Sequence, residues 1–199
     1  IENGELLKKQ FKKIGKKLNK KIRVIFTDGT QPIGNGIGPA LEARDILWIL
    51  KRDPRGPKDL EEKSLLMSEK MLHMAGEKNA RRRVREVLED GTAYEKMIEI
   101  IEAQGRKIIN PNKIRIGRFS VDVKAGRSGR ISLLDNESIN KIARVAGAPV
   151  DAGAGLYLYK HVGDRVKRGE TIFTIYSDSR EKLKYSLDVE KIVKGYQIT

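Results

Sequence analysis

The sequence contains no cysteine, and aromatic residues make up only 6% of its 199 positions. The absence of cysteine excludes disulfide frameworks and metal sites built from thiolates. No apolar run approaches the roughly 20 residues that a membrane-spanning helix needs, and no segment resembles a signal peptide. These absences predict a cytoplasmic protein that does not act in a membrane.

Acidic residues are too few to balance the basic ones, so the formal net charge is +14. A balance this basic favours anionic partners such as nucleic acid, nucleotides or phosphate. Charged residues account for 34% of the chain, which is typical of proteins from heat-adapted organisms. With 39% hydrophobic residues, the chain can still bury a substantial core.

Acidic residues are missing altogether from Lys8 to Lys21, where "KKQFKKIGKKLNKK" contains eight lysines. Around them, Leu7, Phe11, Ile14 and Leu18 recur at spacings of four, three and four, which predicts one amphipathic helix over about residues 4–20. The helix is either docked through its apolar stripe with solvated lysines, or it binds nucleic acid or a membrane surface. Docking is the favoured interpretation, because no aromatic residues interleave with the lysines to stack on bases.

The next segment, residues 22–26, is nearly all apolar and predicts a strand of the kind buried in parallel sheets. Several helices follow it. Pro39 suits the first turn of one of them, and Gly76, Gly91 and Gly105 are expected to follow the ends of three others. Residues 1–112 contain no obvious sheet partner for the strand. The sequence also begins without an initiator methionine. We therefore expect the chain to be a fragment of a larger protein.

The pattern changes after Gly105 to short β-branched runs separated by turn glycines. One helix interrupts these runs at "NESINKIARVAG", with Asn136 as its expected N-cap. The predicted fold class is α+β, with a domain boundary between residues 112 and 113.

The glycine-rich loop "TDGTQPIGNGIG" at residues 27–38 has three candidate explanations. A dinucleotide fingerprint is disfavoured because the spacing is GxGxG, and a P-loop is excluded because Gly-Lys-Ser/Thr is absent. Backbone oxygens with Glu42 and Asp45, one helical turn apart, suit a hard cation. Close packing of the loop against a neighbouring element is the explanation that the residues favour.

The loop and the helix after it, "TDGTQPIGNGIGPALEARDILWIL", resemble a segment of the thymidine and pyrimidine-nucleoside phosphorylases. The similarity extends to "VREVLEDGTAYEKMIEIIEAQG", "AGRSGRISLLDNESINKIARVAGAP" and "GLYLYKHVGDRVKRGETIFTIYS", so it covers nearly the whole chain. The lysine-rich composition and the segment "GNGIGPALEARD" are most similar to the archaeal branch of the family, whose members are AMP phosphorylases.

This resemblance implies a parent glycosyltransferase that cleaves AMP or a nucleoside with inorganic phosphate as co-substrate. The products are the free base and ribose 1,5-bisphosphate or a sugar 1-phosphate. No organic cofactor is implied, and a homodimer or larger homo-oligomer is expected. Residues 1–112 would be the C-terminal part of the α/β catalytic domain, and residues 113–199 a small hammerhead or barrel-sandwich-like domain.

The resemblance places the family's phosphate-binding, base-binding and proton-donating residues upstream of this chain. We therefore expect no catalytic or substrate-binding residue here, and no activity from the chain alone. Its bacterial members bind potassium near the glycine loop, which implies a candidate site at the carbonyls of Ile33 and Gly36 and the carboxylate of Asp45. Asp45 is one methylene shorter than the family's usual glutamate.

Some motifs remain outside this interpretation. "VGDRVKRGETIFTI" also resembles biotinyl and lipoyl carrier domains, but Lys124 lacks the hairpin context of a modified lysine. "KAGRSGR" at residues 124–130 is either a phosphate contact or a charged turn. The arginines at residues 81–83, His73 and His161 are interpreted as structural or surface residues.

The alternative function for the whole chain is nucleic-acid binding through residues 8–21. Binding of this kind would weaken steeply as the salt concentration rises.

Overall fold

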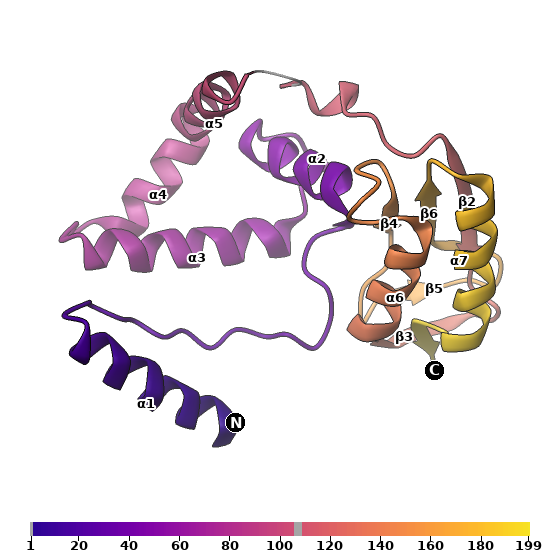
Figure 1. Ribbon diagram of the computed structural model, residues 1–199, viewed down its shortest axis with the longest axis horizontal. Helices are drawn as coiled ribbons and strands as arrows, with labels where there is room; N and C mark the ends of the chain where they lie inside the picture. Colours follow the sequence, from indigo (N-terminus) through magenta and orange to yellow (C-terminus); the bar gives the residue numbers. More distant parts are fainter. Residues whose placement is uncertain (1, 106–108) are drawn as a thin grey trace.

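The computed structural model describes residues 2–105 and 109–199, which form helices and antiparallel sheets (Figure 1). A helical portion extends away from a β-rich portion that contains the C-terminus. The helices are α1 (Glu2–Lys17), α2 (Pro39–Leu50), α3 (Lys58–Met74), α4 (Ala80–Glu89), α5 (Thr92–Ala103), η1 (Pro111–Lys113), α6 (Asn136–Ala146) and α7 (Arg180–Val193). The strands are β1 (Gly36–Ile37), β2 (Phe119–Lys124), β3 (Gly129–Leu134), β4 (Gly155–Leu158), β5 (Arg165–Val166), β6 (Thr171–Ser177) and β7 (Tyr196–Ile198).

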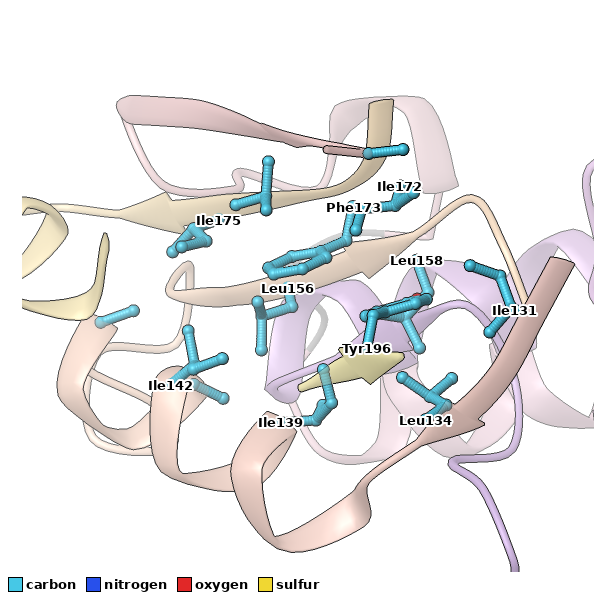
Figure 2. Packing of buried hydrophobic residues seen from close by; sticks show 14 of the residues in the cluster. Ile131, Leu134, Ile139, Ile142, Leu156, Leu158, Ile172, Phe173, Ile175 and Tyr196 are labelled. Atoms are coloured by element: carbon cyan, nitrogen blue, oxygen red, sulfur yellow. The ribbon is translucent and has the colours of Figure 1, made fainter. Parts of the chain in front are cut away.

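The strands form two sheets, one in the order β1-β4-β6-β2 and the other in the order β5-β3-β7. Neighbouring strands in both sheets run antiparallel. Side chains from the two sheets and from α6 meet in one hydrophobic core, shown in Figure 2. Phe173 lies at its centre and stacks on Tyr196 with 5.4 Å between ring centroids. The mixed helix and sheet architecture agrees with the predicted α+β class.

Helix α6 begins one residue earlier than the sequence suggested. The side chain of Asp135 accepts a hydrogen bond from the backbone N–H of Ser138 at 2.7 Å, so Asp135 is the N-cap. Asn136, the predicted cap, lies inside the helix, and its Nδ2 instead donates to the carbonyl of Gly29. Aspartate and asparagine both suit the N-cap position, so residue type alone does not decide which of these two adjacent residues caps the helix. The local backbone conformation decided it.

The glycine loop ends in the short strand β1, which joins the sheet of the β-rich portion. Gly36 is paired with Tyr157 and Ile37 with Leu156. Helix α2 follows directly, with Pro39 in its first turn as predicted, and it packs against β1, β4 and η1. Residues before and after position 112 therefore share one sheet.

The predicted strand at residues 22–26 is wrong for this chain. The segment is not a strand, because no described strand lies beside it to exchange ladder hydrogen bonds. It instead runs back along α1, where Ile22 packs against Gly15 and Phe26 against Gly4. Backbone groups of an isolated extended segment cannot be paired internally, so apolar composition alone does not produce a strand.

Helix α1 forms over almost the predicted residues, but its apolar stripe is not docked. Phe11 is 53% exposed and Leu18 is 64% exposed, and no part of the described chain covers them. Helix α3 is similar, since none of its residues is buried and Met71 is 70% exposed. None of the described helices combines the length and apolar character that crossing a bilayer requires.

Candidate functional site

Four backbone amides near the end of the glycine loop donate to carboxylates. Gly34 N–H donates to Asp59 Oδ2 at 3.0 Å, and Gly38 N–H donates to Glu42 Oε1 at 3.0 Å. Between them, the N–H groups of Asn35 and Gly36 both donate to Asp45 Oδ2, at 2.9 and 2.6 Å. These donors are therefore already occupied by negative charge, so the loop does not have the free amides of a phosphate cradle.

Two of the glycines are required by close approach of the backbone. A Cβ atom at Gly36 would lie 2.5 Å from the carbonyl carbon of Leu41. Gly38 has φ of 118°, and a Cβ atom there would collide with the carbonyl oxygen of Ala154. The expectation that this loop packs closely against a neighbouring element is confirmed, and the neighbours are α2 and the segment that leads into β4.

Asp45 is the buried centre of the loop, with only 1% of its surface exposed. Its Oδ2 accepts the two loop hydrogen bonds, whereas its Oδ1 is buried and has no hydrogen-bond partner among the described residues. Burial raises the pKa of the Asp45 carboxyl above its ordinary value, against the opposing effect of the Gly36 and Asn35 amides. The charge of Arg44 also lowers this pKa, but no donor among the described residues bonds to Oδ1 itself.

The three residues of the candidate potassium site line one cavity of about 350 Å³. Ile33, Gly36 and Asp45 meet there with oxygen-bearing side chains from Glu42 and from α6, the latter Asn136 and Asn140. Among the described residues, no three His, Cys, Asp or Glu side chains are grouped to hold a metal ion. The lining thus offers the carboxylates of Asp45 and Glu42 together with neutral oxygens, which suits a hard cation.

A cluster of aromatic rings and arginines lies beside this cavity, at the contact of α2 with β4. The Arg44 guanidinium lies 4.6 Å from the Trp48 ring centroid and 4.8 Å from that of Tyr157. Arg55 also lies over Trp48, at 4.6 Å. Such cation–π contacts hold a helix against a sheet without requiring a carboxylate partner. No sequence pattern had indicated this cluster, because Tyr157 comes from β4, more than 100 residues away from Arg44 and Trp48.

Polar side chains join the glycine loop to the β4–β5 segment. His161 Nε2 lies 2.9 Å from Asn35 Oδ1, and the backbone N–H of Val162 donates to Gln31 Oε1 at 2.9 Å. The residue pairs are more than 120 positions apart in the chain. His161 is thus a partly buried linking residue, and His73 is an exposed residue in the last turn of α3, which agrees with the structural roles predicted for both.

Comparison with known proteins supports the resemblance. Residues 130–199 match the model of the pyrimidine nucleoside phosphorylase C-terminal domain. A protein of Rhodopseudomonas palustris (strain BisB18), named "Putative thymidine phosphorylase", is 40% identical over 196 residues, covering 96% of this chain and 37% of its own length. Relatives with the same name are 42% identical over 174 residues in Bradyrhizobium sp. (strain BTAi1) and 40% identical over 187 residues in Legionella pneumophila.

These two relatives match 86% and 92% of this chain, and 34% and 35% of their own lengths. The chain thus spans little more than a third of the length of the curated relatives it matches. All three relatives are bacterial, whereas the sequence style had suggested the archaeal branch. Residues 130–199 are thus similar to a pyrimidine nucleoside phosphorylase C-terminal domain, and nearly all of the chain is similar to proteins named as putative thymidine phosphorylases.

Proposed function

We propose that this chain is part of a phosphorylase that cleaves the N-glycosidic bond of a nucleoside or of AMP with inorganic phosphate. The match of residues 130–199 to the phosphorylase C-terminal domain carries the proposal. The names of the relatives favour thymidine as the substrate, whereas the resemblance to the archaeal branch favours AMP. The products would be the free base with a sugar 1-phosphate, or with ribose 1,5-bisphosphate.

In this proposal the chain supports the catalytic site and does not contain it. Both histidines are structural or exposed, and the loop amides are occupied by Asp59, Asp45 and Glu42. Residues 113–199 would form the hammerhead-like domain, and the shared sheet of β1 and β4 would hold residues 1–112 against it. The longer protein would act as a homodimer or larger homo-oligomer, without an organic cofactor.

An activity assay separates the chain from its longer relatives. We expect this chain to release no free base when it is incubated with phosphate and, in turn, AMP, thymidine and uridine. Chromatography of the bases provides the measurement, and a full-length relative provides the positive control. Release by this chain alone would mean that catalytic groups lie within residues 1–199, and it would overturn our assignment of a supporting role.

The alternative function, nucleic-acid binding through residues 8–21, has one structural observation in its favour. The lysine-rich helix α1 leaves its apolar stripe exposed, including Phe11, although Gly4 and Gly15 on the same helix are covered by Phe26 and Ile22. An exposed helix of this kind could reach a polyanion, but it presents only one aromatic ring for base stacking. Binding of a labelled oligonucleotide that falls steeply with salt would support this alternative.

We also propose that the cavity at Ile33, Gly36 and Asp45 takes a potassium ion. The buried Oδ1 of Asp45, which accepts no hydrogen bond, supports this, because a cation would give that oxygen a direct partner. Potassium at ten times its dissociation constant should add about 1.4 kcal/mol to the free energy of unfolding. Thermal unfolding in potassium chloride and in tetramethylammonium chloride of equal ionic strength gives the comparison.

The matched variant for this experiment is Asp45→Asn. Its amide oxygen can still accept the hydrogen bonds of Asn35 and Gly36, but it lacks the negative charge. We expect the potassium-dependent rise in Tm to disappear in this variant. An equal rise in both proteins would place the ion elsewhere, and no rise in the original chain would refute the site.

A further inference from the structure

A second cavity lies in the elbow between α3 and α4, far from the β-rich portion (Figure 1). Its volume is about 480 Å³, which is within the range of roughly 300–1,000 Å³ for small-molecule sites. No carboxylate lines it. The lining residues are His73, Lys78, Asn79, Arg81, Arg82 and Arg85.

The arginines of this elbow repel one another. Arg81 and Arg85 are four residues apart on α4, so they lie on one face, where like charges destabilise a helix. The first turn of α4 contains no acidic residue, although acidic side chains are the ones favoured at that end of a helix. The sequence therefore concentrates positive charge where helix electrostatics disfavours it, and local conflicts of this kind are typical of binding sites.

The acidic residues near the elbow already have partners. Glu86 pairs with Arg82 at 3.2 Å, and Glu69 pairs with Lys70 at 2.7 Å. Glu77 Oε1 accepts the backbone N–H of Asn79 at 2.7 Å. Among the described residues, no carboxylate lies within ion-pair distance of Lys78, Arg81 or Arg85. Arg81 acts on Glu69 only from a greater distance, as the smallest of the causes that lower the pKa of that carboxyl. All three basic groups therefore lack a direct ion pair and can contact a ligand.

We propose that this elbow binds a small anion with two or more phosphoryl groups, such as inorganic diphosphate or a nucleoside diphosphate. Guanidinium groups suit phosphate because two parallel N–H donors can contact two oxygens. One phosphate monoester has a charge of only about −2 at pH 7. The summed positive charge of Lys78, Arg81 and Arg85 is larger than that negative charge. A ligand with two or three linked phosphoryl groups therefore balances the charge better.

The two histidines of the chain make a direct test available. His73 lines the elbow cavity, whereas His161 lies at the glycine loop. Inorganic pyrophosphate is added to the intact chain, and the two imidazole signals are followed by NMR at constant ionic strength. We expect a saturable shift of the His73 signal with His161 unchanged. No shift of His73, or equal shifts of both, would overturn the proposal.

Charge variants on α4 make the test specific. Arg81→Gln and Arg85→Gln should each weaken pyrophosphate binding by about tenfold, since each removes a charge-assisted phosphate contact. Arg83→Gln is the matched control, because it removes the same charge from the same helix at a residue that does not line the cavity. The affinity of the Arg83→Gln variant for pyrophosphate should stay within about twofold of that of the unchanged chain. Equal weakening by all three variants would show only a diffuse attraction to positive charge.

Competing ligands distinguish the source of the phosphoryl groups. Equal displacement by ADP and pyrophosphate would support recognition of the phosphoryl chain alone, and stronger displacement by ADP would identify a nucleotide. Tight binding of a single-stranded oligonucleotide with weak binding of pyrophosphate would overturn the proposal in favour of a nucleic-acid surface. None of these measurements requires turnover, so a failed phosphorylase assay leaves the result unaffected.

Discussion

Asp45→Ala should lower the free energy of unfolding by about 2–6 kcal/mol, since it strips the acceptor from two backbone donors and each unsatisfied buried group costs about 1–3 kcal/mol. Those donors are the N–H groups of Asn35 and Gly36, which both bond to Asp45 Oδ2. The loop containing them is held between α2 and β4, so it cannot turn the amides to solvent without breaking the β1–β4 pairing. Urea unfolding followed by circular dichroism measures the loss.

Asp45→Asn is the control for this prediction as well. The amide oxygen of asparagine preserves an acceptor for both donors, and removal of the charge relieves the burial penalty that raises the pKa of Asp45. The asparagine variant should therefore be clearly more stable than the alanine variant. A loss below about 1 kcal/mol for alanine would mean that water replaces the carboxylate, and that the loop is held mainly by packing.

Phe173→Ala should cost about 3–5 kcal/mol, the usual range for removing a fully buried aromatic ring. Phe173 is 0% exposed and lies between the two sheets, where its ring stacks on Tyr196 (Figure 2). Loss of the ring would leave a cavity lined by both sheets and remove the contact between β6 and β7 side chains. The free energy of unfolding of the β-rich portion, obtained from the midpoint and slope in urea, is the quantity to compare.

Phe11→Ala on α1 is the matched control for the ring deletion. Phe11 is 53% exposed, so its truncation removes little buried area and should change stability by less than about 1 kcal/mol. The contrast between the two variants tests whether the core lies where Figure 2 shows it. A cost at Phe11 similar to that at Phe173 would show that α1 is covered in solution, for example by a second copy of the chain.

Local sequence signals identified most of the helices well. Pro39 and the apolar spacing after it predicted α2, and Gly76, Gly91 and Gly105 were expected to follow helix ends. All three glycines have positive φ and lie two residues after the ends of α3, α4 and α5. These signals succeed because the conformations they require are set by the residue itself and its neighbours within one turn.

The candidate site was predicted only in part. The resemblance to the phosphorylases implied one candidate cation site at Ile33, Gly36 and Asp45, and these three residues line one cavity. It did not indicate that Asp45 would accept the loop amides. The links from Asn35 to His161 and from Arg44 to Tyr157 were also missed, because the partners lie more than 100 residues apart.

The sequence by itself determined the basic charge of this protein, most of its helix ends and the close packing of its glycine loop. Only the tertiary structure decided which extended segments became strands. Residues 22–26 have the stronger β composition but find no partner, whereas Gly36 and Ile37 form a strand because β4 lies beside them. A helix pairs its backbone N–H and C=O groups within itself, whereas a strand must pair them with a neighbouring segment. Which segment lies beside it is set by the tertiary structure.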